Sequence, residues 1–199
     1  MSLFVTSDTH WGHAKMLSFV NEDGSPVRPF SCLEEMHETM VERWNKKVNA
    51  KDTVYHLGDV AIPRSGLKLL ERLNGRKILM RGNHDIFKLR DYAEYFEDIR
   101  GCHYRNGLVF SHIPVHRNCF ISERYKGNVH GHLHGHLVMH DEQKDAFYFN
   151  ACVEHHDYAP VEWEKIQAYF AQDHGRASDV QYAHSGAMES RHSQLIACH

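Results

Sequence analysis

Carboxylate, amide and imidazole side chains recur in five short clusters along this sequence. The clusters are Asp8-Thr9-His10, Gly58-Asp59, Gly82-Asn83-His84-Asp85, Ser111-His112 and Gly131-His132-Leu133-His134. Mixed oxygen and nitrogen ligands suit borderline divalent ions such as Mn, Fe, Ni, Co or Zn better than Ca or a thiolate-bound metal. A single Asp-x-His pair is a weak signal, because an ordinary surface turn also explains it. The clusters taken together predict a metal centre.

Each cluster follows a segment that is expected to be a short β-strand. The expected strands cover residues 3–7, 53–57, 77–80, 108–110 and 128–129. Loops at the C-terminal ends of strands converge on one crevice in layered α/β folds, so the clusters should meet there. Asp8 and His10 are two residues apart, which predicts that both project from the same side of an extended segment. The same holds for His132 and His134.

The remaining pattern predicts helices between these strands. Ser31 and Glu34 resemble a capping box that opens an amphipathic helix ending near residue 49. Further helical stretches are expected around 67–73, 86–96 and 160–171, with a late strand at 147–149. This alternation indicates an α/β layered fold. We expect one domain over residues 1–171 and a tail or loosely docked extension over 172–199, where apolar periodicity ends.

Composition narrows the class of protein. The 199 residues include 23 Lys and Arg against 26 Asp and Glu, a net charge of −3, with 42% hydrophobic residues. This is ordinary globular composition, and it disfavours a broad basic face for nucleic acid. The 19 histidines favour metal or acid–base chemistry. The five cysteines form no C-x-x-C pair. Neither a signal peptide nor an apolar run of membrane-spanning length is visible. We therefore expect a cytoplasmic protein without a membrane partner.

The ordered motifs D-x-H, G-D, G-N-H-D, H and G-H-x-H resemble the calcineurin-like metallophosphoesterase superfamily. The resemblance covers residues 3 to about 170. Within the superfamily, the chain is similar to the small bacterial or phage members. It implies a four-layer α-β-β-α sandwich of two mixed β-sheets flanked by helices, with the site between the loop edges of the sheets.

The resemblance also implies a role for each motif residue. One metal ion would take Asp8, His10, Asp59 and His134, and the second would take Asp59, Asn83, His112 and His132. Asp59 would bridge two divalent transition-metal ions, with manganese as the first candidate. Such a pair would activate a metal-bound hydroxide for attack on phosphorus. His84 would protonate the leaving oxygen or stabilise the transition state, and Asp85 would orient His84.

Four further residues are candidate substrate contacts. They are His13, Arg28, Arg81 and Arg117. A helix-surface histidine is an equal alternative for His13, and a solvated surface arginine is the alternative for each arginine.

The expected activity is hydrolysis of a phosphodiester or phosphomonoester bond in a small or nucleotide-like substrate. Two departures argue against a protein serine/threonine phosphatase. Gly58-Asp59 is followed by Val60-Ala61, and the third motif ends in Asp85 where those phosphatases have Glu. A nuclease or RNA-end-processing enzyme of the same chemistry is one alternative, which the net charge disfavours. A non-catalytic nickel or zinc buffer is another, but a buffer has no use for Asn83-His84. The sequence leaves the oligomeric state open.

Overall fold

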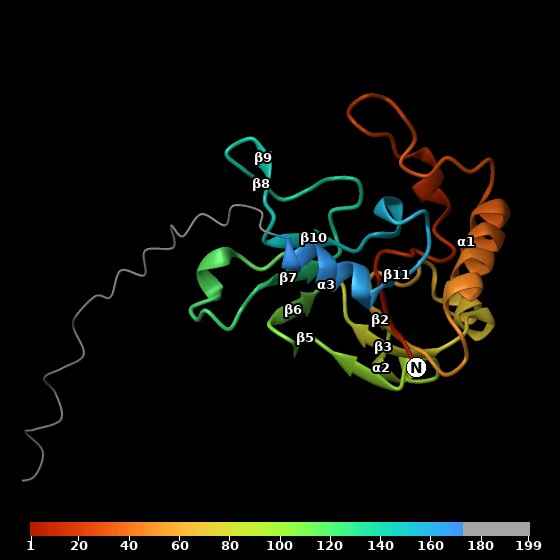
Figure 1. The fold of residues 1–199 in the computed structure, drawn as a ribbon. Coiled ribbons are helices and arrows are strands. Elements are labelled where there is room, and N and C mark those ends of the chain that lie inside the picture. The colour runs from red at the N-terminus through yellow and green to blue at the C-terminus, as the bar shows by residue number, and fades with distance from the viewer. Residues whose placement is uncertain (173–199) are drawn as a thin grey trace, which may run out of the picture.

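The computed structural model describes residues 1–172, which form two β-sheets with helices packed against them (Figure 1). The five-stranded sheet has the order β11-β1-β2-β3-β4, formed by Val161–Glu162, Leu3–Thr6, Thr53–His56, Arg76–Met80 and Asp98–Arg100. Its strands are parallel except β11, which is antiparallel to β1. The four-stranded sheet has the order β10-β7-β6-β5, formed by Tyr148–Asn150, Gly127–His130, Leu108–Ser111 and Cys102–Arg105, with β5 antiparallel to β6. The expected α/β class with two mixed sheets is confirmed.

The strands of the five-stranded sheet send alternate side chains to two separate hydrophobic clusters. Phe4, Val54 and Leu79 belong to an outer cluster beneath the helices. Their neighbours Val5 and Tyr55 belong to an inner cluster shared with the four-stranded sheet. This is the two-residue period of a strand buried on both faces, and it explains why these segments read as continuous apolar runs.

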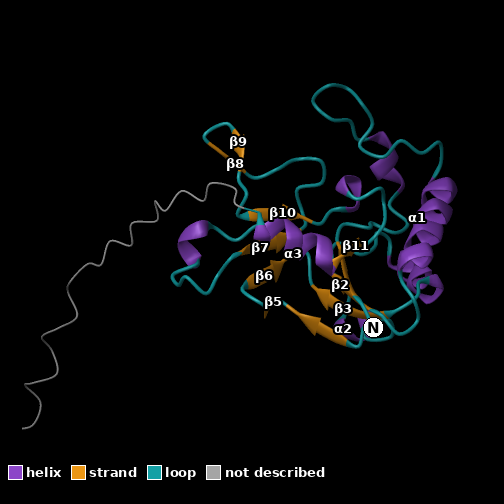
Figure 2. Ribbon diagram, in the orientation of Figure 1, coloured by secondary structure: helices purple, strands orange, loops and turns teal. Residues whose placement is uncertain are grey.

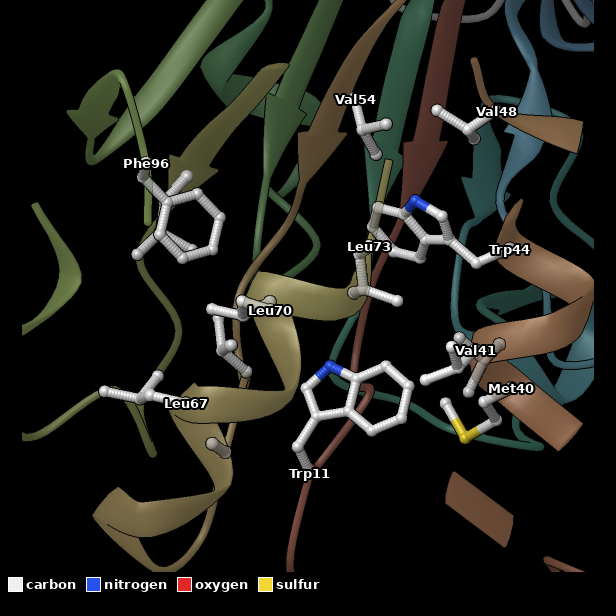
Figure 3. Packing of buried hydrophobic residues seen from close by; sticks show 14 of the residues in the cluster. Trp11, Met40, Val41, Trp44, Val48, Val54, Leu67, Leu70, Leu73 and Phe96 are labelled. Carbon is white, nitrogen blue, oxygen red and sulfur yellow. The ribbon is translucent and has the colours of Figure 1, made fainter. Parts of the chain in front are cut away.

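Helix α1 (Leu33–Lys47) and the 3₁₀ helix η2 (Arg64–Arg72) cover the outer face of the five-stranded sheet (Figure 1). Figure 3 shows Trp11 between Leu67 and Leu70 of η2 and Met40 of α1. The Trp11 side chain is completely buried, and it follows directly after the first cluster of polar residues. The outer core therefore anchors the chain immediately after the metal-ligand candidates Asp8 and His10.

The inner cluster fixes the two sheets to each other. Phe110 of β6 and Val129 of β7 pack in this cluster with strand residues of the other sheet. Helix α3 (Trp163–Ala171) adds Trp163, Ile166 and Phe170 to the same cluster. The C-terminal ends of β1, β2, β6 and β7 are consequently held at one edge of the pair of sheets.

Several expected helix boundaries were wrong. The N-cap of α1 is Cys32, whose Sγ accepts the N–H of Glu35 at 3.4 Å. The Ser31 side chain pairs with Glu35 rather than Glu34, with Oγ 2.5 Å from Oε2, so the capping interaction is displaced by one residue. The residues after Pro160 do not open a helix, because Val161 and Glu162 pair with β1 as strand β11.

Other elements differ in length or were not expected. Helix α2 is confined to Leu89–Tyr92, within the predicted stretch 86–96, and strands β4 and β5 were missed. The short remaining elements are η1 (Ala14–Ser18), η3 (Arg117–Cys119), η4 (Val153–His155), β8 (Met139–His140) and β9 (Gln143–Lys144). The β8–β9 hairpin stands away from the two sheets (Figure 2).

The predicted tail, apart from residue 172, lies outside the described residues, so the domain boundary stays a prediction. Within residues 1–172, no helix combines the length and apolar character needed to cross a membrane.

Candidate metal centre

Six of the predicted ligands form two compact groups at the loop edge. Asp8, His10 and His134 make the first ligand group, and Asp59, His112 and His132 make the second ligand group. Within each group the ligand atoms lie within 4.8 Å of one another. Each group combines residues that follow β1 or β2 of the five-stranded sheet with residues that follow β6 or β7 of the other sheet.

Asp59 lies between the two groups. Its Oδ2 is 3.8 Å from Nε2 of His10 and 3.5 Å from Nε2 of His112. Its other oxygen, Oδ1, accepts the backbone N–H of His84 at 2.9 Å. One carboxylate oxygen is thus fixed by the backbone while the other faces both groups, which is the arrangement that a bridging ligand requires.

Asn83 adds an amide oxygen to the second ligand group. Its Oδ1 lies 2.8 Å from Nε2 of His112. The Nδ1 of His112 lies 2.8 Å from the carbonyl oxygen of Leu57, so Nδ1–H donates there and Nε2 carries the free lone pair. The seventh predicted ligand therefore lies with the group to which the resemblance assigned it.

Unpartnered buried atoms in the first ligand group provide a test of whether a metal ion fits. Asp8 Oδ1 and both ring nitrogens of His10 are buried and have no hydrogen-bond partner among residues 1–172. Burying such atoms without a partner is costly. A divalent cation bound by Asp8 Oδ1 and one His10 nitrogen would satisfy two of the three, and the carboxylate, imidazole and amide donors suit a borderline metal.

The other oxygen of Asp8 is held by three donors. Oδ2 accepts from Ser7 Oγ at 2.5 Å, the His132 backbone N–H at 2.9 Å and Cys152 Sγ at 3.3 Å. Burial alone would raise the pKa of Asp8. The neighbouring His10 ring, whose Nε2 lies 3.7 Å from Asp8 Oδ1, and the charges of His112 and His134 outweigh this effect and hold the pKa well below its usual range. Asp8 is therefore an anionic candidate ligand with Oδ1 free.

The backbone at the ligands differs from the sequence prediction. Asp8, His10, Asp59, His132 and His134 all have positive φ angles, between 47° and 70°. The expected projection of Asp8 with His10, and of His132 with His134, from extended segments was wrong. Left-handed turns bring these side chains together, and Asp, Asn and His are the side-chain-bearing residues that tolerate that region best.

Two glycines allow the ligand loops to approach closely. A Cβ on Gly131 would lie 2.0 Å from Ser7 Oγ and 2.4 Å from Asp8 Oδ2. A Cβ on Gly58, where φ is +99°, would lie 2.4 Å from the backbone nitrogen of Gly82. The glycines of the motifs therefore make room for backbone and ligand atoms of neighbouring loops.

His84 is exposed, and its ring centroid lies 5.7 Å from that of His10. It adjoins both ligand groups without belonging to either. Asp85 does not have the partner that was expected. Its buried carboxylate accepts the backbone N–H groups of Asp59, Gly82 and Val60, at 2.8–3.0 Å, so it fixes two ligand loops rather than the His84 ring.

Arg28 is neither a substrate contact nor a solvated surface arginine. Its side chain is completely buried and donates to the backbone carbonyls of Asp8 and Thr9 and to the carboxylate of Glu154. Sequence reasoning missed Glu154, because an isolated glutamate outside the motifs gives no signal.

The other arginines also have intramolecular partners. Arg117 pairs with the carboxylate of Asp145 through Nε at 2.8 Å and through a second nitrogen, and it stacks over Phe147. Arg81 is exposed and donates to the carbonyl oxygen of Asp85. The expected substrate role of Arg117 is not supported, because its guanidinium is already paired.

His13 lies beside the first ligand group. Its ring centroid is 5.5 Å from that of His10, and its buried Nδ1 has no partner among the described residues. Burial lowers its pKa, and the neighbouring His10 and His84 lower it further. His13 thus remains a candidate substrate contact.

Fold and site together define an α/β protein with two candidate metal sites, and the Asp59 carboxylate of the second lies 3.8 Å from His10 of the first. The family model of the calcineurin-like phosphoesterases matches residues 1–186. The chain belongs to the calcineurin-like phosphoesterase family. The match extends past the predicted domain boundary at residue 171.

Three similar proteins accompany this match. An uncharacterized protein of Methanocaldococcus jannaschii is 43% identical over 89 residues, which is 43% of this chain and 47% of that protein. The gene 66 protein of Mycobacterium phage D29 is 35% identical over 89 residues, 42% of this chain and 40% of that protein. The chain therefore spans less than half the length of these curated relatives. A solved structure of a protein of unknown function from Aquifex aeolicus shares the fold, with a TM-score of 0.65, 26% identity, and coverage of 84% of this chain and 98% of that chain.

Proposed function

We propose that this protein is a dinuclear metal-dependent phosphoesterase that hydrolyses a phosphodiester or phosphomonoester bond of a small or nucleotide-like substrate. The position of Asp59 Oδ2, 3.8 Å from His10 Nε2 and 3.5 Å from His112 Nε2, is the observation that carries this proposal. A single structural ion would need neither a shared carboxylate nor a second ligand group.

When bound, two divalent ions supply Lewis-acid stabilisation of the phosphoryl oxygens and lower the pKa of the attacking water. The first ligand group would hold one ion and the second ligand group, with Asn83, the other. Manganese is our first candidate, followed by Fe, Ni, Co and Zn.

His84 is our proposed general acid. The backbone N–H of His84 is fixed on Asp59, while its side chain is exposed beside the ligands. As the bond between phosphorus and the leaving oxygen breaks, the imidazolium form of His84 donates a proton to that oxygen. His13, whose ring centroid lies 5.5 Å from that of His10, is the candidate for binding the substrate.

The net charge of −3 disfavours a broad basic face for nucleic acid, which favours a compact substrate over a polynucleotide. We also propose a cytoplasmic location, which accords with the free thiols of the four cysteines in residues 1–172.

The test is an activity screen of the full chain reconstituted separately with Mn²⁺, Zn²⁺, Co²⁺ and Ni²⁺. The substrates would be phosphate diesters, monoesters, cyclic nucleotides, dinucleotides and single-stranded RNA. We expect turnover of at least one small ester, and its loss in Asp59→Asn. Cleavage of RNA alone would favour the nuclease alternative, and metal binding without turnover of any substrate would contradict the proposal.

A further inference from the structure

A buried ion pair lies directly behind the first ligand group. The Arg28 side chain is 0% exposed and the Glu154 side chain 6% exposed. Glu154 Oε1 accepts from Arg28 Nε at 3.0 Å and from a terminal guanidinium nitrogen at 2.8 Å. The two residues are 126 positions apart, and neither belongs to a motif that the sequence identified.

Glu154 fixes the orientation of one ligand. Its Oε1 lies 3.0 Å from Nδ1 of His134, so the ring donates Nδ1–H to the carboxylate. The opposite nitrogen, Nε2, is then left with its lone pair facing Asp8 Oδ1, at 3.8 Å. A carboxylate behind an imidazole sets both the tautomer and the direction of a ligating histidine.

Arg28 fixes the backbone of the other two ligands. One guanidinium nitrogen donates to the Thr9 carbonyl at 2.9 Å and another donates to the Asp8 carbonyl. These carbonyls belong to the turn in which Asp8 and His10 have positive φ angles. One buried side chain therefore holds the strained turn and, through Glu154, the ring of His134.

The second ligand group is supported differently. His112 Nδ1 donates to the carbonyl oxygen of Leu57 rather than to a carboxylate. Asp59 is oriented by the backbone of His84. Within residues 1–172, the hydrogen bonds of the buried ion pair reach residues of the first ligand group and none of the second.

We propose that Arg28 and Glu154 are positioning residues that preorganise the first ligand group and so set the affinity of one of the two metal ions selectively. This inference rests on the proposed dinuclear centre. The pair shapes the site before an ion arrives, since it holds the carbonyls of Asp8 and Thr9 and the His134 ring at the same time. Removing the Glu154 carboxylate frees the His134 ring to rotate. It also leaves the buried charge of the Arg28 guanidinium without its carboxylate partner, next to Asp8 and His10.

The experiment compares Glu154→Gln and Glu154→Ala with the wild-type chain. Each protein, loaded with Mn²⁺, is titrated with a chelator, and the ions retained per chain are counted by elemental analysis. We expect one ion to be released at a 10- to 100-fold lower chelator concentration and the other to be retained as in wild type. Glu154→Gln keeps an acceptor for His134 Nδ1–H, so its loss should be smaller than that of Glu154→Ala. The visible spectrum of Co²⁺-loaded protein should change in both variants.

Asp145→Asn is the matched control. Asp145 is also a buried carboxylate paired with an arginine, Arg117, but it lies outside both ligand groups. It should leave both ions and the Co²⁺ spectrum unchanged. Unchanged affinities in the Glu154 variants would overturn the inference, as would equal weakening of both ions, which indicates a merely structural role. Wild-type protein that holds no ions would instead defeat the proposed function. If Glu154→Ala does not fold, Glu154→Gln alone decides.

Discussion

The carboxylate of Asp85 accepts the backbone N–H of Asp59 at 2.9 Å, and so the last residue of the third motif holds in place the residue that we propose as the shared ligand. The same side chain accepts from Gly82 at 2.8 Å and Val60 at 3.0 Å. Burial raises the pKa of Asp85, and the hydrogen bonds from Gly82 and Val60 act in the opposite direction. Asp85 is therefore a brace between two loops.

Asp85→Ala tests this brace. It would leave three backbone N–H groups without their acceptor, so we expect the free energy of unfolding to fall by about 3 kcal/mol. The ions per chain should fall as well, because Asp59 would no longer be fixed. Urea unfolding at constant Mn²⁺ and elemental analysis measure the two effects. Asp141→Ala, at a side chain that is 92% exposed, is the control. A variant with wild-type stability would show that the brace is dispensable.

Asp59→Asn tests the shared ligand. The wild-type chain should hold about two ions after reconstitution, because two ligand groups share this carboxylate. The variant should hold fewer ions at the same free metal concentration, because the amide lacks the negative charge that both ions need. Asp98→Asn, which removes a surface ion pair with Arg100, should retain both ions. Wild-type protein with a stoichiometry near zero would contradict the metal assignment.

His84→Ala separates catalysis from metal binding. Because His84 belongs to neither ligand group, the variant should keep both ions while turnover falls by about 10²–10⁴-fold. The decrease should be greater for an alkyl or ribose leaving oxygen than for nitrophenolate, which departs without much protonation. Both substrates and the metal content would be measured on the same samples. Equal losses on both substrates would assign His84 to transition-state stabilisation, and loss of metal would make it structural.

His56 gives the protein an acid-sensitive core. It is completely buried, with Nδ1 accepting the Gly58 N–H at 3.2 Å and Nε2 2.9 Å from Thr9 Oγ1. Burial lowers its pKa to about 3. The unfolded chain binds a proton at this position below about pH 6.5 and the folded chain does not, so stability present above that pH is lost as the pH falls.

We therefore expect His56 to reduce the free energy of unfolding by up to about 1.4 kcal/mol per pH unit between pH 6 and pH 4. The difference between wild type and His56→Gln, followed by thermal unfolding at constant Mn²⁺, isolates this contribution because protonation of the ligands affects both proteins. His140→Gln, at an exposed histidine, should keep the wild-type dependence. Identical slopes for all three proteins would show that His56 is not the responsible group.

The sequence predicted which side chains gather at the loop edge, because residue types and their order along the chain are visible in the sequence itself. Asp59, His112 and His132 follow apolar strands, and strand ends at one sheet edge must converge. The left-handed backbone of the ligands was not predictable from the extended pattern, since only packing of the neighbouring loops imposes it. The functions of Arg28 and Glu154 were equally hidden. Their partnership depends on a tertiary contact between distant segments, and the sequence predicted only a substrate contact or a solvated surface residue for Arg28.

The origin of the ligands in both sheets has a mechanical consequence. The first ligand group joins Asp8 after β1 to His134 after β7, and the second ligand group joins Asp59 after β2 to His112 after β6. Each ion would therefore act as a cross-link between layers that are otherwise joined by side-chain packing and by hydrogen bonds such as that of His112 Nδ1–H with the Leu57 carbonyl. The binding free energy of each ion would stabilise the interface between the sheets, so the stability of this interface would rise with the metal concentration. Hydrogen exchange in β6 and β7 would then respond to metal supply, and loss of the ions would weaken the contact between the sheets as well as the proposed activity.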